Sequence, residues 1–225
     1  MKKYIVRILF LLSISLHSQT TITKTLGDYS ILKIYNGIEV ELIKSEKQEL
    51  VISGEKSEKV KIKNTNNTLK IYLKFPEILA DGKVKVVVYY SKNINTVDAN
   101  EGATITAKGF NQNQLEVKTQ EGALINMVIE TKYLTVKAIS AGVVKLTGTT
   151  KNQHVEVNDA GVYHGYSLKA TDSSIIRAAL GGKAEVNVGE TLDAKIRFGG
   201  TIFYKGTPEV LKTKKVLGGT IEAKN

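Results

Sequence analysis

The chain has 225 residues, no cysteine and a formal net charge of +10 at pH 7. Without cysteine there is no disulfide framework, no thiolate metal site and no lipid-attachment cysteine. The excess charge is spread evenly along the chain, with one dense cluster at 212–215. A nucleic-acid-binding protein concentrates its basic residues on one element, so the sequence argues against that partner. It favours a solvated basic surface, with loose attraction to anionic polysaccharide or lipid as the alternative.

Residues 1–18 have the layout of a secretory signal peptide. Lys2, Lys3 and Arg7 form a basic start, and an apolar core follows over 8–16. This core is far too short to span a bilayer as a helix. We expect cleavage near Ser18 and export to the periplasm, the outer surface or the medium. No later apolar run approaches the ~20 residues of a transmembrane helix.

The remaining residues, 19–225, are expected to form a single domain. Its N-terminal half consists of short segments in which apolar residues alternate with Lys, Glu or Thr, a pattern typical of half-buried strands. These segments are Leu32–Ile34, Ile38–Leu42, Leu50–Ile52, Val60–Ile62 and Leu69–Leu73. Turn dipeptides such as Asn36-Gly37 separate them. Helix signals are almost absent, which predicts an all-β protein with short N-terminal strands.

From about residue 95 to the end, a corner of small residues recurs. Its central glycines are Gly102, Gly122, Gly142, Gly161, Gly182, Gly200 and Gly219. Their spacings are 20, 20, 19, 21, 18 and 19 residues. Alternating apolar pairs lie before and after most corners. The pair after the corner begins one residue further from the glycine in the late repeats than in the early ones.

A unit of about twenty residues cannot bury an apolar face alone, but stacked units can. The repeat therefore predicts a right-handed parallel β-helix, or β-solenoid, with coils ~4.8 Å apart. An antiparallel sandwich or meander is the alternative. In the solenoid, one continuous interior should contain Val117, Ile125, Val136, Leu146 and Val157.

Several segments carry a family resemblance. They are residues 31–40, residues 50–54, the repeated Gly-Ala corners and residues 203–208. In this order they resemble the head GIN domain of putative auto-transporter adhesins, over roughly 30–208. The resemblance implies an exported bacterial β-solenoid that is adhesin-like and has little demonstrated activity. After residue 140 the Gly-Ala corner changes to Gly-Val, Gly-Lys and Gly-Thr, so the later coils are expected to turn differently.

Enzymatic motifs are sparse, and we expect no catalytic residue, no cofactor and no metal. The best catalytic candidates are Glu101 and Glu121, which occupy equivalent corner positions and should lie one coil apart. Two close carboxylates can share a raised pKa and work as an acid–base pair, or they can bind calcium. The simpler interpretation is that both are solvated corner residues.

The segment around residue 164 is the one place where aromatic rings and a titratable group come together. Tyr163, His164 and Tyr166 could form a stacking platform for sugar rings or a flat partner. The alternative is that one or two of these rings fill the interior. The aromatic residues of 198–204 are expected to lie in the core.

The predicted function is an exported, non-enzymatic, adhesin-like module that presents a solenoid surface to a polysaccharide, a matrix component or a surface protein. The alternative is a polysaccharide-processing enzyme on the same scaffold. A structural assembly unit is a third class, and an uncapped end able to stack would distinguish it. The sequence gives no oligomeric state.

Overall fold

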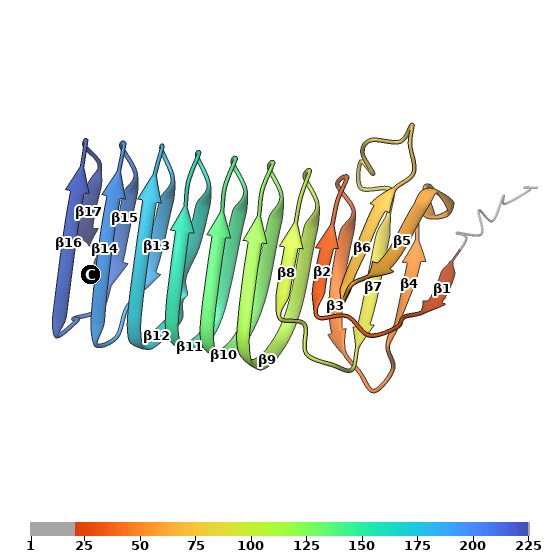
Figure 1. The fold of residues 1–225 in the computed structure, drawn as a ribbon, viewed down its shortest axis with the longest axis horizontal. Coiled ribbons are helices and arrows are strands. Elements are labelled where there is room, and N and C mark those ends of the chain that lie inside the picture. The colour runs from red at the N-terminus through yellow and green to blue at the C-terminus, as the bar shows by residue number, and fades with distance from the viewer. Residues whose placement is uncertain (1–20, 225) are drawn as a thin grey trace, which may run out of the picture.

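Parallel strands stacked in register make up most of the molecule (Figure 1). The computed structural model describes residues 21–224, so the predicted signal peptide lies outside the described residues. Within 21–224 there are seventeen strands and one short 3₁₀ turn, Ser57–Lys59. The strands are β1 (Ile22–Thr25), β2 (Ile31–Ile34), β3 (Glu39–Lys44), β4 (Glu49–Ser53), β5 (Val60–Thr65), β6 (Thr68–Leu73), β7 (Lys85–Tyr90), β8 (Thr96–Ala99), β9 (Thr104–Thr119), β10 (Leu124–Ala138), β11 (Val143–Val157), β12 (Val162–Ala179), β13 (Lys183–Asn187), β14 (Thr191–Arg197), β15 (Thr201–Lys205), β16 (Val210–Val216) and β17 (Thr220–Ala223). The all-β class and the β-solenoid are confirmed.

The solenoid has two faces, which meet at a row of tight corners and at a row of bends. Face A contains β7, β3, the first parts of β9 to β12, and then β13, β15 and β17. Face B contains β6, β2, β8, the second parts of β9 to β12, and then β14 and β16. In Figure 1 the corners form the row along the upper edge.

One filled interior lies between the faces. All five residues that the sequence placed there, Val117, Ile125, Val136, Leu146 and Val157, are buried, with at most 1% exposure. Alternate side chains of a strand point to opposite sides, so aligned coils stack apolar residues on one another and leave the polar ones outside. Repeats of about twenty residues thus share one continuous apolar core.

Each corner begins with two consecutive residues in the left-handed region, as in the tight turns of β-hairpins. In the early coils these are Glu101-Gly102 and Glu121-Gly122, whereas in the next coil they are Ser140-Ala141. The repeated glycine therefore lies one place later from Gly142 onward, which explains the changed position of the apolar pair relative to the glycine. A Cβ at Gly142 would lie only 2.7 Å from the backbone of Thr119 in the preceding coil, so close approach requires glycine there.

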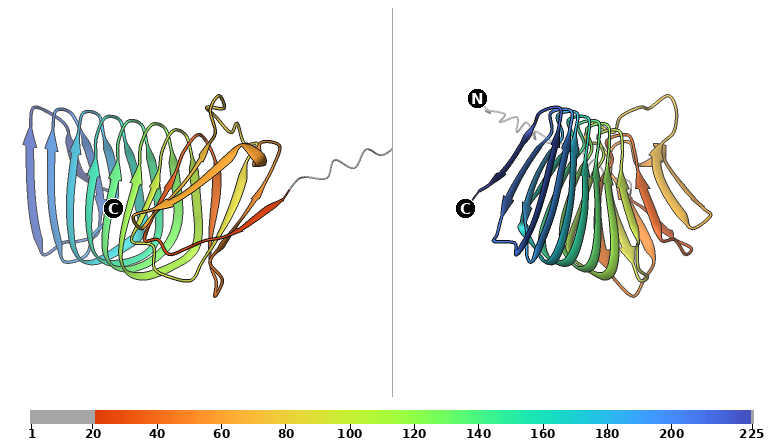
Figure 2. Two further views of the ribbon diagram at one scale, coloured as in Figure 1. Left: turned by 45° about the vertical axis from the view of Figure 1, so that its right-hand side comes forward. Right: turned by 60° about the vertical axis from the view of Figure 1, so that its left-hand side comes forward.

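The N-terminal half is also part of the stack, although the strands are not in chain order. The coil formed by β2 and β3 lies between the coil of β6 and β7 and the coil of β8 and β9. Antiparallel strands then cover this end: β4 and β1 extend face A, and β5 pairs with β6 on face B. Figure 2 shows these strands closing one end of the stack.

The C-terminal end of the described chain has no such cover. Strand β16 pairs only with β14, and β17 pairs only with β15. The inward positions of β16 are Leu211, Thr213 and Lys215, which follow Leu192, Ala194 and Ile196 of β14 in register. The last coil thus replaces two apolar interior positions by a hydroxyl and an ammonium group.

Candidate functional site

Tyr163 lies in the solenoid interior and is fully buried. In the stack of inward-pointing side chains, it lies between Val144 of the preceding coil and Ala184 of the next coil. Its ring occupies space left by Gly165, where a Cβ would be 2.5 Å from the ring. Its hydroxyl donates to Oε1 of Gln153 at 3.4 Å, and burial raises its pKa. The predicted surface contact by Tyr163 is therefore wrong, because alternation along β12 turns this side chain inward.

His164 and Tyr166 do lie on the outside of face A. Nδ1 of His164 is 2.7 Å from Oε2 of Glu185, and Nζ of Lys183 is 2.6 Å from Oε1 of the same carboxylate. Nζ of Lys205 is 4.8 Å from the ring centroid of Tyr166. These contacts place a half-exposed imidazole and a phenol in one polar cluster, and ligand contact by these two side chains stays a prediction.

Phe203 extends this cluster by one coil. Its ring lies on face A, with Nζ of Lys183 at 5.5 Å and Nζ of Lys224 at 4.7 Å from its centroid. Cation–π contacts of this kind stabilise exposed aromatic rings modestly. Phe203 is therefore an outward residue, and so is Phe198, which is 53% exposed at a corner. Of the aromatic residues expected in the core, Tyr204 alone packs partly against it.

Glu101 and Glu121 occupy adjacent corners, as expected, and both are exposed. The amide of Gly102 donates to the backbone oxygen of Glu121 at 3.0 Å, and Nδ2 of Asn36 donates to Oε2 of Glu101 at 2.7 Å. Residues 21–224 contain no group of three His, Cys, Asp or Glu side chains that could hold a metal ion. These carboxylates have the surroundings of solvated corner residues.

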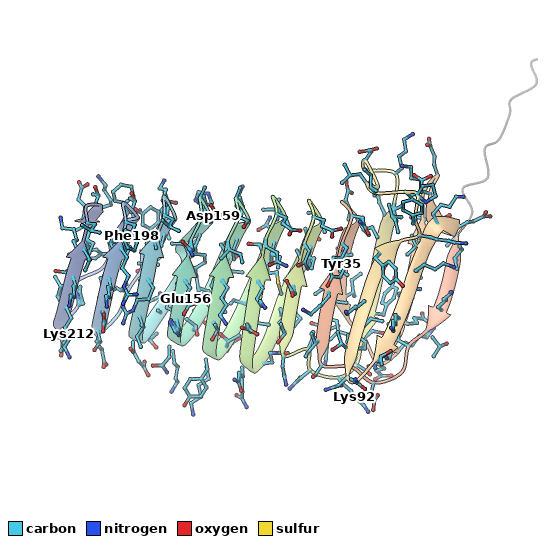
Figure 3. All side chains as sticks on the ribbon, turned by 45° about the horizontal axis from the view of Figure 1, so that its top comes forward. Tyr35, Lys92, Glu156, Asp159, Phe198 and Lys212 are labelled. Carbon is cyan, nitrogen blue, oxygen red and sulfur yellow. The ribbon has the colours of Figure 1, made fainter. Side chains whose placement is uncertain are left out.

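Face B carries a feature that the sequence analysis missed. One outward position bears a charged residue in all nine consecutive strands of this face. In spatial order the residues are Lys70, Lys33, Asp98, Lys118, Lys137, Glu156, Arg177, Lys195 and Lys214. From Asp98 onward their spacings of 18 to 21 residues follow the coil repeat, so an alignment of the coils would have found them. Figure 3 shows Glu156 of this series on face B.

Ion pairs neutralise this series unevenly along the solenoid. Nζ of Lys33 is 3.0 Å from the buried carboxylate of Asp98. Nη1 of Arg177 is 2.8 Å from Oδ1 of Asp193. On the outer side of face B, the four basic residues beyond Asp193 make no ion pair within residues 21–224. We call these four the basic track: Lys195, Arg197, Lys212 and Lys214.

The like charges of the basic track repel one another. The charge of Arg197 contributes most to lowering the pKa of Lys195, followed by desolvation and by Lys214. Like charges opposite each other on neighbouring strands are destabilising. An open hollow of about 320 Å³ lies beside the track, between Glu156 and Arg197. The C-terminal part of face B is thus a cationic surface.

The sequence of residues 28–208 matches the family described as putative auto-transporter adhesin, head GIN domain. The chain belongs to this family. The match covers the N-terminal coils and the repeats as far as β15, and it confirms the resemblance found in the sequence. No curated protein matches the chain.

Solved structures share the fold of this head GIN domain. A putative adhesin from Bacteroides fragilis is 20% identical, with a TM-score of 0.79, and the match covers 92% of this chain and 98% of the other. A protein from Parabacteroides distasonis described as a putative lipid binding protein is 19% identical, with a TM-score of 0.70 and coverage of 93% and 98%. A putative adhesin from Parabacteroides merdae is 20% identical, with a TM-score of 0.65 and coverage of 93% and 98%. At these identities the likeness establishes the fold alone.

No helix among residues 21–224 is long and apolar enough to cross a membrane.

Proposed function

We propose that this head GIN domain protein is an exported, non-enzymatic, adhesin-like module that presents its solenoid surface to a cell-surface, matrix or partner ligand. The supporting observation is the filled interior, in which stacked Val, Ile, Leu and Ala side chains are fully buried. A ligand can therefore reach only the outer faces, the corners, the ends and the inserted loops. Membership of an adhesin family supports the same function.

The polar cluster around His164 and Tyr166 is the contact surface that we propose on face A. It combines an exposed part of a phenol ring, a half-exposed imidazole and two lysines within one coil of each other. Such a surface is shallow, so each contact should be weak. Repeated copies on a cell would raise the overall affinity through multivalency.

A glycan and matrix-protein array, probed with the mature protein, tests this proposal. We expect retention on a subset of ligands and a several-fold loss for Tyr166→Ser, with unchanged melting. Tyr133→Ser serves as the matched control, because Tyr133 is 50% exposed and lies beside Lys132 outside the cluster. An array without any retained ligand would contradict the binding function, and equal loss for both variants would contradict the site.

A further inference from the structure

The first residue of each corner changes character along the solenoid. In the first five corners this residue is polar: Asn36, Glu101, Glu121, Ser140 and Asp159. In the last three it is large and apolar: Leu180, Phe198 and Leu217. We call these three residues the apolar ridge. In Figure 3, Asp159 and Phe198 lie on the same row of corners.

The fold alone does not explain the apolar ridge. Its residues have φ values of 47°, 53° and 58°. Left-handed backbone is unfavourable for bulky side chains, whereas Asn and Asp tolerate it best. The three side chains are also 56%, 53% and 71% exposed, so they gain little from burial. Both the conformation and the exposure oppose apolar residues here, and the five preceding corners avoid them.

The apolar ridge is contiguous and lies beside the basic track. Arg197 immediately precedes Phe198. In register, Arg197 lies between Ala179 and Val216, which are the residues before Leu180 and Leu217. Neighbouring strands are ~4.8 Å apart, so three consecutive corners form one continuous apolar line. Lys195 and Lys214 lie on face B, within a few residues of that line. One edge of the C-terminal coils thus combines protruding apolar side chains with unpaired positive charge.

We propose that this edge docks on an anionic lipid membrane. The apolar ridge would enter the boundary between headgroups and acyl chains, and the basic track would contact the negatively charged headgroups. Amphipathic surface elements with Leu or Phe beside Lys or Arg bind membranes in this way. Each basic residue near such a surface contributes about 1 kcal/mol, which corresponds to about five-fold in affinity.

Other occupants fit the edge less well. A second copy would bring two basic tracks together, and three side chains bury far less than the ~1,200 Å² typical of stable interfaces. An anionic polysaccharide would satisfy the basic track but would leave Leu180 and Leu217 in water. The segment between β6 and β7, which contains the exposed Phe75 and Ile78, lies at the other end of the corner row, apart from the basic track (Figure 1).

Vesicle flotation tests the proposal with the mature protein and two lipid compositions. One set contains phosphatidylcholine alone, and the other contains phosphatidylcholine with phosphatidylglycerol. We expect binding to the anionic vesicles, weaker binding to the neutral ones and a decline with added salt. The triple variant Leu180→Asn/Phe198→Asn/Leu217→Asn should lose about a hundred-fold in affinity, if each side chain buries part of its surface. Lys195→Gln should lose about five-fold.

The triple variant is a clean test because asparagine suits left-handed backbone. We expect its melting temperature to be at or above that of the parent. Ser140→Asn is the matched corner control, because it changes a corner residue without changing its charge, and Phe75→Ser is the control for apolar exposure elsewhere; both should bind as the parent does. Unchanged vesicle binding by the triple variant would overturn the proposal. So would parental binding to soluble polygalacturonate with none to vesicles, or a dimer that the triple variant abolishes.

Discussion

At the scale of single residues, the position within a coil decides the role of a side chain. Tyr163 is aligned with Val144, nineteen residues earlier in the chain, and both are buried. Extending the repeat by one coil would therefore have placed Tyr163 inside and its neighbours His164 and Tyr166 outside. The space for the ring could not be read from the pattern, because Gly165 provides it through its missing side chain.

Replacing the buried ring should affect stability far more than replacing the exposed one. Tyr163→Ser removes a large buried side chain and should lower the free energy of unfolding by about 3 kcal/mol or more. Tyr166→Ser should lower it by less than ~1 kcal/mol, because the ring is partly exposed on face A. Urea unfolding of both variants checks this, and similar losses for the two would contradict the inward placement of Tyr163.

An inward charge provides a second test of the interior. Val136→Asp would bury an unpaired carboxylate and should destabilise the protein by about 3 kcal/mol or more. Lys145→Asp, at an exposed position on the next strand, is the control and should change stability little. The measurement is thermal melting of both variants. A Val136→Asp protein that melts within a degree or two of the parent would refute the assignment.

Glu185 should make stability depend on acid pH. Partial burial alone would raise its pKa, but hydrogen bonds from Lys183 and His164 hold the pKa below the ordinary value of 4.5. The folded pKa is thus lower than the unfolded one, so the contribution of Glu185 is complete above about pH 4.5 and disappears as the pH falls through the folded pKa. Glu185→Gln should therefore lose less stability than the parent between about pH 5 and pH 3 in denaturant titrations. Identical acid profiles would contradict this role.

At the scale of elements, the last two described strands leave their outer edges unpaired within residues 21–224. Unpaired strand edges invite further pairing, and inward-pointing charges or edge lysines discourage it. Strand β16 has both, since Lys215 occupies an inward position and Lys212 and Lys214 lie on its outer side. Within residues 21–224 the outer edge of this coil is uncovered, but its chemistry opposes stacking.

Removing this chemistry should let the ends associate. Thr213→Val combined with Lys215→Ile would continue the apolar interior to the surface of the last coil. We expect dimers or longer end-to-end assemblies, measured by sedimentation velocity, because an apolar end with free strand edges is exposed. Lys212→Ile changes an outward position on the same strand and is the control. A double variant that sediments as the parent does would show that another feature prevents stacking.

The sequence predicted the C-terminal coils much better than the N-terminal ones, for a physical reason. Consecutive coils from β9 onward repeat the same turn and the same inward positions, so the pattern can be followed along the chain. The coil of β2 and β3 pairs instead with β6, β7, β8 and β9, which come later in the sequence. Pairing between strands distant in sequence leaves no periodic signal. The alternation of residues 31–44 therefore predicts strands, but it does not show that these strands form a coil.

At the scale of the whole molecule, the solvated corner carboxylates lead us to expect that the protein turns over no polysaccharide. Glu101 and Glu121 lie at exposed corners, with Asn36 as the polar partner of Glu101. Catalysis by two carboxylates also needs a substrate cleft that places the bond between them. Incubation with a panel of anionic polysaccharides, followed by a reducing-end assay, checks this. Cleavage that Glu121→Gln abolishes in a folded protein would establish the enzymatic alternative.

The placement of the β2–β3 coil between later strands sets the order in which the protein can fold. A chain is synthesised from its N-terminus, yet β2 and β3 have no complete set of parallel neighbours until β9 has emerged. Strands β6 and β7 can pair with β2 and β3 on one side, but the other edge of this coil stays open to misassembly until β8 and β9 emerge. Each later coil, in contrast, can add directly to a finished template. We therefore expect the N-terminal coils to close first and the later coils to add to them one by one toward the C-terminus.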